Sequence, residues 1–210
     1  MNAKTASESG SQRSKGANVL MAGVGGQGVL LASETLALAA LVQGLEAKQS
    51  EVHGVAQRGG SVVSHVRFGS RVHSPLIRCG EVDVLYAGEQ LEALRYAHYL
   101  KPGGPVVMSD HTVKPIKMPG DESTYPEGVP EFLRGKGYDV VVVPALRTAV
   151  DLGEKRCANV VLLGALAAYL PLEQESWKAA ITKRFPAKIL DLNLRAFEAG
   201  RQETAPRSVR

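Results

Sequence analysis

One glycine-rich run sets the limits on what this chain can fold into. In residues 18–33 a short apolar stretch ends at Gly23, and an alanine- and leucine-rich helical pattern follows. Three more glycines lie between them, at Gly25, Gly26 and Gly28. This order is typical of a strand, a tight turn and a helix. Glycine suits such a turn because a positive φ does not strain it, and because the missing Cβ leaves the backbone N–H groups open. The helix dipole favours an anion here, so a ligand pocket would open beside the turn.

The spacing Gly23-x-Gly25-x-x-Gly28 also satisfies the dinucleotide-binding fingerprint. That fingerprint needs an acidic residue about twenty positions further on, at the end of a second parallel strand, to hold a ribose hydroxyl. Glu46 and Glu51 are at a suitable separation, but the residues around them are too polar for a buried parallel strand. Three interpretations stay open: an anion pocket, the NAD(P) site of a free-standing reductase, and a turn that only lets helix and strand pack closely.

The length and charge of the chain indicate one domain with two polar tails. A chain of 210 residues with 44% hydrophobic and 5% aromatic residues can bury a core made of valine, leucine and alanine. Of the net charge of +4, residues 1–16 and residues 201–210 carry +2 each, so residues 17–200 are neutral. We therefore predict disordered tails at 1–16 and 201–210 around a single domain at 17–200, and no nucleic-acid partner.

The apolar segments predict a cytoplasmic protein with no membrane span. The first 16 residues lack the apolar region of a secretory signal. The longest apolar run, residues 160–170, is too short to cross a bilayer.

Cysteines and histidines form no metal site in the sequence. Cys79 and Cys157 are isolated, so neither an iron–sulfur cluster nor a zinc site can be assembled, and both are expected to be small buried hydrophobes. His53, His65 and His73 lack a recognised ligand spacing and are expected to be hydrogen-bonded structural residues. The common catalytic motifs are missing as well, including Gly-x-Ser-x-Gly, a P-loop lysine and His-Glu-x-x-His, so no catalytic residue is assigned.

A second glycine turn precedes an alternating segment. Residues 62–68 alternate as in a half-buried strand, and residues 72–77 are predicted to return as its hairpin partner at the sheet edge. Before this strand, residues 57–61 combine two glycines with an arginine and two hydrogen-bonding side chains. That composition suits an anionic ligand or a partner backbone, and a solvated surface turn is the equal alternative.

The remaining chain follows an α/β rhythm. Residues 83–88 and 105–110 are expected to be parallel strands joined by a helix at 89–99, and residues 138–143 a central strand. With the hairpin, this predicts a three-layer Rossmann-like α/β domain with a mostly parallel central sheet, an edge β-hairpin and a C-terminal helical segment.

The C-terminal part is expected to be helical. Residues 158–169 are apolar on nearly every side, which favours docking of this helix against another chain, because a small domain has a limited interior. Asn159 is expected to cap this helix or to hydrogen-bond a neighbouring loop. The last helix is predicted at 187–199, closed by Gly200.

The two glycine motifs and three later segments carry a family resemblance. Residues 23–34, 50–67, 74–77, 91–96 and 100–104 resemble the gamma-type domain of 2-oxoacid:ferredoxin oxidoreductases, in particular the small (beta) subunits of the indolepyruvate ferredoxin oxidoreductases. The resemblance covers residues 17–195.

This resemblance implies an accessory role. In the family a large (alpha) subunit carries thiamine diphosphate, Mg and iron–sulfur clusters, decarboxylates an arylpyruvate or other 2-oxoacid, passes electrons to ferredoxin and hands the acyl group to coenzyme A. The gamma-type domain holds no redox centre, packs on the large subunit and is associated with coenzyme A.

The implied pocket draws on both glycine turns, although the turns could equally brace the subunit contact. The first turn is proposed to shape an anion or acyl-carrier pocket, and the second segment to line that pocket or the seam to the large subunit. The residues assigned in this way are Gly23, Gly25, Gly26, Gln27 and Gly28, followed by Ser50, Glu51, Gln57, Arg58, Gly59, Gly60 and Ser61.

Overall fold

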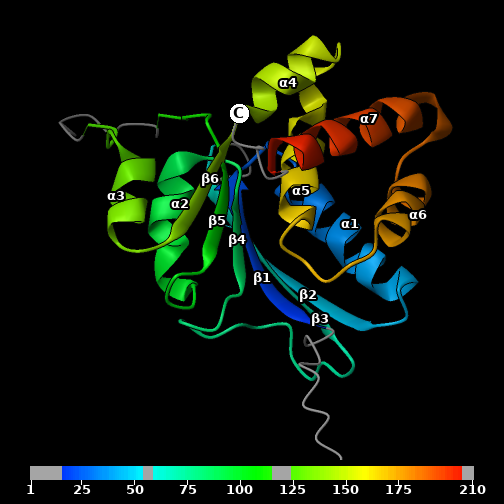
Figure 1. Ribbon diagram of the computed structural model, residues 1–210, viewed down its shortest axis with the longest axis horizontal. Helices are drawn as coiled ribbons and strands as arrows, with labels where there is room; N and C mark the ends of the chain where they lie inside the picture. Colours follow the sequence, from blue (N-terminus) through cyan, green and yellow to red (C-terminus); the bar gives the residue numbers. More distant parts are fainter. Residues whose placement is uncertain (1–15, 54–58, 115–123, 205–210) are drawn as a thin grey trace, which may run out of the picture.

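The computed structural model of the protein describes residues 16–53, 59–114 and 124–204. Within these ranges six strands form one sheet in the order β2-β3-β1-β4-β5-β6 (Figure 1). From β1 to β6 the strands run parallel, whereas β3 pairs antiparallel with β1 and β2 antiparallel with β3. The strands are β1 (Ala17–Val24), β2 (Glu46–His53), β3 (Ser61–Gly69), β4 (Val84–Ala87), β5 (Pro105–Ser109) and β6 (Asp139–Val143).

Helices cover both faces of the sheet, which confirms the three-layer α/β prediction (Figure 1). One face carries α1 (Val29–Val42), α5 (Ala158–Ala167), α6 (Gln174–Arg184) and α7 (Ala187–Thr204). The other face carries α2 (Gln90–Tyr96), the 3-10 turn η1 (Ala97–Tyr99) and α3 (Val129–Gly135). Helix α4 (Ala145–Asp151) and the 3-10 turn η2 (Lys155–Cys157) connect β6 to α5. None of the helices within the described ranges combines the length and apolarity needed to cross a bilayer.

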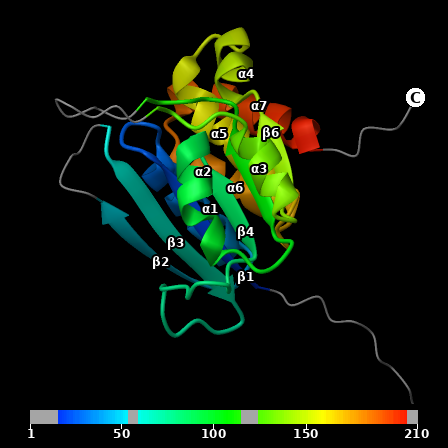
Figure 2. The ribbon, with the colours of Figure 1, turned by 90° about the vertical axis from the view of Figure 1, so that its left-hand side faces the viewer.

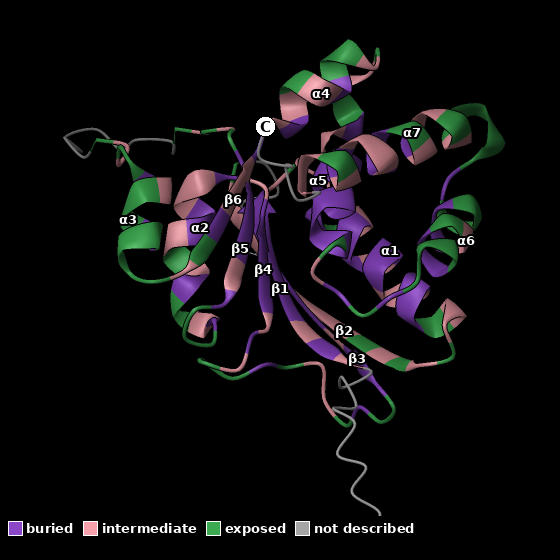
Figure 3. Cartoon of the chain, viewed as in Figure 1, coloured by how far each residue is buried: buried purple, intermediate pink, exposed green. Residues whose placement is uncertain are grey.

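The core divides into two apolar clusters, one on each face of the sheet. Val19 and Met21 of β1 face the cluster around α1 and α5, and Leu20 and Ala22 face the cluster around α2 and α3. This alternation follows from the two-residue period of a strand. Because both faces are covered, β1 is buried along most of its length, as Figure 3 shows in purple.

The edge hairpin is present, but its partner was predicted wrongly. β3 pairs with β2, which precedes it, and not with residues 72–77 (Figure 2). Arg67 binds the backbone of that later segment, donating from Nη1 to the carbonyls of Ser74 and Leu76 at 3.2 Å each. Pro75 has no N–H to offer a ladder. The polarity of residues 46–53 reflects an antiparallel strand at the sheet edge, where one side of the strand meets solvent.

The position of β6 also differs from the expected one. Helices cover both of its faces, as the valine-rich run indicated, but β6 lies at the edge of the sheet and not at its centre. Burial on two faces makes a strand apolar whether or not a neighbour pairs with each of its edges. The hydrophobic pattern therefore could not distinguish the two positions.

Helix α5 is buried by its own chain, so its expected docking against another chain is not needed to explain its composition. All its residues except Ala158 are buried, against α7, α4, α1 and the sheet (Figure 3). Gly164 and Gly200 let α5 and α7 touch: an added Cβ would lie 2.0 Å from the Phe197 carbonyl oxygen and 1.7 Å from the Val161 carbonyl oxygen, respectively. Gly200 is thus a packing residue inside α7, which continues to Thr204, and not a helix terminator.

Candidate functional site

A cavity of about 630 Å³ opens at the carboxyl ends of the central parallel strands. There, α1 leaves β1 toward one face of the sheet and α2 leaves β4 toward the other (Figure 1). Such a switch point is where open α/β sheets commonly bind ligands. The turn after β1 lines the cavity together with Gly59, Gly88, Lys155, Arg156 and Asn159. The cavity lies beside residues 25–28, where the sequence predicts a ligand pocket, and its ligand stays a prediction.

The glycines of the first turn serve different purposes. Gly26 has a φ of 100° and an added Cβ would meet nothing within 4 Å, so this position is open to the cavity and needs glycine for its backbone angle. Gly23 is required for packing, because a Cβ would lie 2.7 Å from Cγ2 of Val29. Gly28 combines both demands: its φ is 75° and its Cβ would lie 2.5 Å from Nδ2 of Asn159.

The turn also uses part of its own backbone. Gly25 donates its N–H to the Gly60 carbonyl at 2.8 Å, and Gln27 donates its N–H to the Val24 carbonyl at 3.0 Å. In the first turn of α1, the N–H groups of Val29 to Leu31 have no partner within the helix, because the carbonyls that would accept them precede it. Helix α1, which is described in full, has no side-chain cap and no acidic residue in that turn. An anion at its start would meet the positive end of the dipole without competition.

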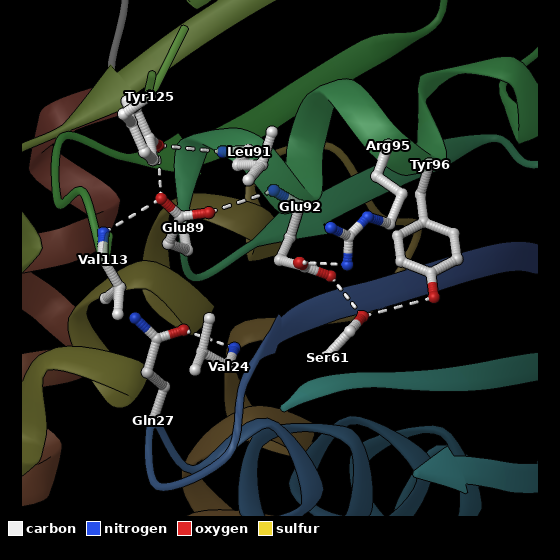
Figure 4. A network of polar contacts seen from close by, with 10 residues as sticks. All are labelled: Val24, Gln27, Ser61, Glu89, Leu91, Glu92, Arg95, Tyr96, Val113 and Tyr125. Carbon is white, nitrogen blue, oxygen red and sulfur yellow. Dashed lines mark hydrogen bonds and ion pairs between the residues drawn. The ribbon is translucent and has the colours of Figure 1, made fainter. Parts of the chain in front are cut away.

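Gln27 holds the turn in place. Its Oε1 accepts from the Val24 N–H at 2.8 Å (Figure 4). Its Nε2 donates to the Gly88 carbonyl at 3.1 Å. One amide therefore joins the ends of β1 and β4. An added Cβ on Gly88 would lie 2.9 Å from Gln27 Oε1, so this approach requires a glycine after β4. Gln27 therefore lines the cavity and also fixes the position of the turn beside it.

The second glycine turn meets the first. Gly59, with a φ of 76°, lines the cavity, and the Gly60 carbonyl accepts the Gly25 N–H. Ser61 turns to α2 instead: its hydroxyl donates to the carboxylate of Glu92 and lies 3.4 Å from the Tyr96 hydroxyl (Figure 4). The structure thus brings the two glycine turns together and directs Ser61 to a neighbouring helix.

The other predicted residues of the second segment lie apart from the cavity or outside the described residues. Ser50 and Glu51 are on β2, two strands away from β1, and do not line the cavity. Two antiparallel pairings give β2 the direction of β1, so its end reaches the same edge of the sheet. Gln57 and Arg58 lie outside the described residues, and their roles stay predictions.

Two cations at the cavity were missed by the sequence interpretation. Lys155 and Arg156 of η2 are exposed and line the cavity. Glu154 holds Arg156, accepting from Nη2 at 2.7 Å and from the Arg156 N–H at 3.1 Å, and this pair lowers the pKa of Glu154 to about 2. Within the described ranges, no carboxylate lies within ion-pair distance of Lys155. A positive charge without such a partner therefore lines the same cavity as the start of α1.

Asn159 connects α5 to the first turn, as the sequence suggested. Its Nδ2 donates to the Gly28 carbonyl at 3.2 Å. The hydroxyl of Tyr86, a buried residue of β4, lies 3.4 Å from the Asn159 carbonyl oxygen, and burial raises the pKa of this tyrosine. Asn159 lies 131 positions from Gly28 in the sequence, so no local pattern could have paired these two residues.

A buried carboxylate ties residues 111–114 to α2. These four residues, here called the strap, lie beside the cavity. Glu89, the N-cap of α2, accepts from the Glu92 N–H and the Val113 N–H at 3.1 Å each and from the Tyr125 hydroxyl (Figure 4). The Tyr125 hydroxyl in turn accepts from the Leu91 N–H at 3.1 Å. Burial and the bond to Glu89 raise the pKa of Tyr125. The position of Val113 at the cavity wall therefore depends on Glu89.

Glu92 of α2 is a second buried carboxylate. Burial raises its pKa, while the hydrogen bond from Ser61 and the positive charge of Arg95 oppose the rise. The two buried carboxylates thus hold the strap and the second turn, respectively.

The described residues contain no group of three or more His, Cys, Asp or Glu side chains placed to hold a metal ion. His65 is a structural residue, as expected: its Nδ1 accepts the Ile77 N–H at 3.2 Å, and burial lowers its pKa. Cys157 is buried, but Cys79 is exposed, so the expectation that both would be buried is wrong for Cys79. Cys79 follows residues 72–77, which do not form the expected strand.

The topology does not provide the acid that a nicotinamide dinucleotide needs. In the dinucleotide fold the acidic residue ends a parallel strand next to β1. Here the neighbour of β1 on that side is the antiparallel β3, and Glu46 and Glu51 are one strand further out, on β2. Neither carboxylate therefore occupies the place of the ribose ligand.

Comparison with known proteins places this fold and site in a class. The chain belongs to the pyruvate ferredoxin/flavodoxin oxidoreductase family, whose model matches residues 18–203, and it has the gamma-type domain of that family.

Its relatives narrow the class. The chain is 39% identical to the indolepyruvate oxidoreductase subunit IorB of Thermococcus kodakarensis, over 87% of this chain and 93% of that protein. It is 40% identical to the subunit of the same name from Archaeoglobus fulgidus, over 87% and 92%. Among solved structures, it resembles the keto/oxoacid ferredoxin oxidoreductase gamma subunit of Geobacter sulfurreducens, with a TM-score of 0.69 and 29% identity, over 90% of this chain and 98% of that one.

Proposed function

We propose that this chain is the accessory small subunit of an arylpyruvate-oxidising ferredoxin oxidoreductase and that its cavity takes coenzyme A. The relatives at 39% and 40% identity, matched over 93% and 92% of their length, are named as indolepyruvate oxidoreductase subunits, which supports an aryl 2-oxoacid as substrate. A large partner subunit would hold the thiamine diphosphate, Mg and iron–sulfur clusters and pass electrons to ferredoxin. In this proposal the small subunit contributes to the acyl-transfer half of the reaction.

The observation that carries the coenzyme A proposal is the presence of two positive features around one cavity. The cavity is lined by the start of α1, with its unpaired N–H groups, and by Lys155 and Arg156. Coenzyme A carries a pyrophosphate, and a helix start is a ready site for such a group. The open space at Gly26 allows close approach of phosphate oxygens to the backbone.

The residues of this chain would bind and orient the coenzyme. Lys155 and Arg156 would neutralise phosphate charge, and Arg156 is already held in place by Glu154. Gln27 and Asn159 would keep the turn in its binding shape through the Gly88 and Gly28 carbonyls. Bound coenzyme A supplies the thiol that takes up the acyl group.

Replacing Lys155 tests the pocket. In the complex of this chain with its large subunit, Lys155→Ala should weaken coenzyme A binding about tenfold, since a charge-assisted contact is lost. Lys178→Ala removes another exposed lysine, which pairs with Glu175 on α6, and should leave the affinity unchanged. Isothermal titration calorimetry measures both, and size-exclusion chromatography verifies assembly.

Two results would argue against the pocket. Equal affinities of wild type and Lys155→Ala for coenzyme A would contradict the proposed phosphate contact. A wild-type complex that binds no coenzyme A would contradict the whole proposal. A chain that is stabilised by NADH and reduces a substrate unaided would instead support the free-standing reductase.

The proposal also includes a cytoplasmic location, where free cysteines such as Cys79 and Cys157 stay reduced. Co-purification from the native cell with mass spectrometry tests the partner assignment, and cell fractionation tests the location. A chain recovered without any oxidoreductase subunit would contradict the assignment.

A further inference from the structure

One buried acceptor at the cavity has no partner. Asn159 is 6% exposed, and its Oδ1 is buried without a hydrogen bond to any described residue. Buried polar atoms in native proteins are nearly always paired, so such an atom calls for a specific explanation. Ser64 Oγ and Trp177 Nε1 are also unpaired, but neither residue lines the cavity.

The orientation of the Asn159 amide is fixed by its other end. Nδ2 donates to the Gly28 carbonyl at 3.2 Å. A reversed amide would place Oδ1 against that carbonyl oxygen, and two acceptors cannot bond. Oδ1 is therefore the atom left for another partner. The residue stands beside the start of α1, where the proposed phosphate group would lie.

We propose that Asn159 is a positioning residue for the ligand, with Oδ1 accepting a neutral N–H or O–H of a phosphate ester bound at the start of α1. This inference rests on the proposed function of the cavity. The site then recognises two chemical features together: an anionic phosphate near Lys155, and a neutral donor next to it. Coenzyme A has both, because its phosphates are attached to a chain and a nucleoside that carry amide and hydroxyl donors. Inorganic pyrophosphate has the charge but lacks these amide and sugar hydroxyl donors.

The same residue would link binding to the shape of the turn. A ligand bound to Oδ1 contacts the same amide group whose Nδ2 donates to the Gly28 carbonyl. Gly28 is the N-cap of α1 and has a positive φ. The position of the ligand's donor and the position of the phosphate site thus both depend on the side chain of Asn159. A purely structural Asn159 would brace the turn without distinguishing coenzyme A from pyrophosphate.

The test compares two probes on the assembled complex, with the ratio of their dissociation constants as the readout. Asn159→Leu should lower the preference for coenzyme A over pyrophosphate about tenfold, because a buried hydrogen bond to the ligand is lost. Asn159→Asp keeps an acceptor but loses the donor to the Gly28 carbonyl and adds a negative charge; both changes weaken the binding of both anions, so the ratio should stay within about threefold of the wild-type value. Competition titrations by calorimetry give both constants.

Asn193→Leu is the matched control. Asn193 is a buried asparagine of α7 whose Nδ2 also donates to a carbonyl, that of Ile189, and it does not line the cavity. Its replacement should leave the ratio unchanged. Where the Asn159→Leu complex does not assemble, Asn159→Ala replaces it, with the same expected loss of preference.

The outcomes separate this inference from the function on which it rests. An unchanged ratio in Asn159→Leu or Asn159→Ala, with both probes weakened equally, would show that Asn159 only braces the turn, and the coenzyme A pocket would stand. A wild-type complex with no preference for coenzyme A over pyrophosphate would also overturn the inference. No coenzyme A binding in the wild type would overturn the proposed function itself.

Discussion

Single residues with unusual backbone angles shape the cavity. Gly26, Gly28 and Gly59 all have positive φ, and each lines the cavity. An L-residue strains in this region because its Cβ approaches the following carbonyl oxygen. The site is therefore built from positions where the side chain is absent for backbone reasons, and the close approach of Asn159 adds a packing reason at Gly28.

Gly28→Ala should destabilise the protein more than Gly44→Ala. Both positions have positive φ, at 75° and 82°, so each substitution costs about 1–2 kcal/mol of backbone strain. Gly44 is open, whereas the new Cβ at Gly28 would displace the Asn159 amide and cost at least about 1 kcal/mol more. Urea unfolding measures the two free energies. Equal losses would show that the contact with Asn159 is not stabilising.

His65 should make the protein less stable in mild acid. Burial lowers its pKa below the usual 6.5, so the unfolded chain takes up a proton at a pH where the folded chain does not. The contribution of His65 is present above pH 6.5 and is lost as the pH falls below that value. In His65→Gln, which keeps an acceptor for the Ile77 N–H, the loss of stability between about pH 7.5 and about pH 5.5 should be smaller.

Thermal unfolding at the two pH values measures this difference. Glu92, whose pKa burial raises, acts in the opposite direction and is the same in both proteins. Identical pH dependence in wild type and variant would show that His65 does not govern the acid response.

At the scale of elements, the crossing of α5 and α7 sets the position of the cavity wall. Asn159 lies in the first turn of α5, and α5 is held against α7 at Gly164 and Gly200. The aromatic rings of Trp177 and Phe197, 5.4 Å apart, pack α6 against α7 beside this crossing. A shift of α5 would therefore move Asn159 away from the first turn.

Gly200→Ala should be strongly destabilising, by about 3 kcal/mol, because its Cβ would overlap the Val161 carbonyl and force the helices apart. Gly135→Ala is the control. Gly135 is also helical, has open space around it, and should gain up to about 0.5 kcal/mol from reduced chain entropy. Urea unfolding compares them, and a mild effect at Gly200 would mean that the crossing tolerates separation.

Glu89 should control the order of the strap that carries Val113. Glu89→Ala removes the acceptor for the Val113 N–H and the Tyr125 hydroxyl, so the Val113 amide should exchange at least about tenfold faster. Glu131→Ala, at an exposed carboxylate paired with Arg134 on α3, should leave that amide unchanged. Hydrogen exchange measures both, and unaltered protection in Glu89→Ala would refute the role of the carboxylate.

Local patterns predicted the parts of the fold that depend on neighbours in sequence. The strand, turn and helix around Gly26 and the alternation in β3 are short-range signals, and the place of the pocket followed from them. The pairing of β3 with β2 and the edge position of β6 depend on which strands meet in space. Residues 46–53 were not predicted as a strand because they are polar, and they are polar because β2 lies at the edge of the sheet.

The candidate site divides in the same way. The sequence pointed to the glycines that line the cavity, but Lys155 and Arg156 carry no motif and reach it through the return of the chain after β6. The burial of α5 was predicted, but its cover by α7 was not, because α7 approaches at Gly164 and Gly200 and the sequence indicated Gly200 only as a helix end. Tertiary contacts between distant segments decide each of these points.

At the scale of the whole molecule, the described part of the chain fits a binding role within a larger enzyme. Within the described residues there is no metal-binding cluster, and the cavity offers backbone N–H groups and cations. Family membership and the named relatives fit a subunit that works within a larger oxidoreductase. The central claim is that this chain depends on a partner for its reaction.

Turnover of an arylpyruvate with coenzyme A and ferredoxin, measured for the isolated chain and for the chain assembled with its large subunit, tests this claim most directly. The account predicts ferredoxin reduction by the assembled complex, dependent on coenzyme A, and none by the isolated chain. Oxidation of the 2-oxoacid by the isolated chain, with no companion subunit in the sample, would contradict it.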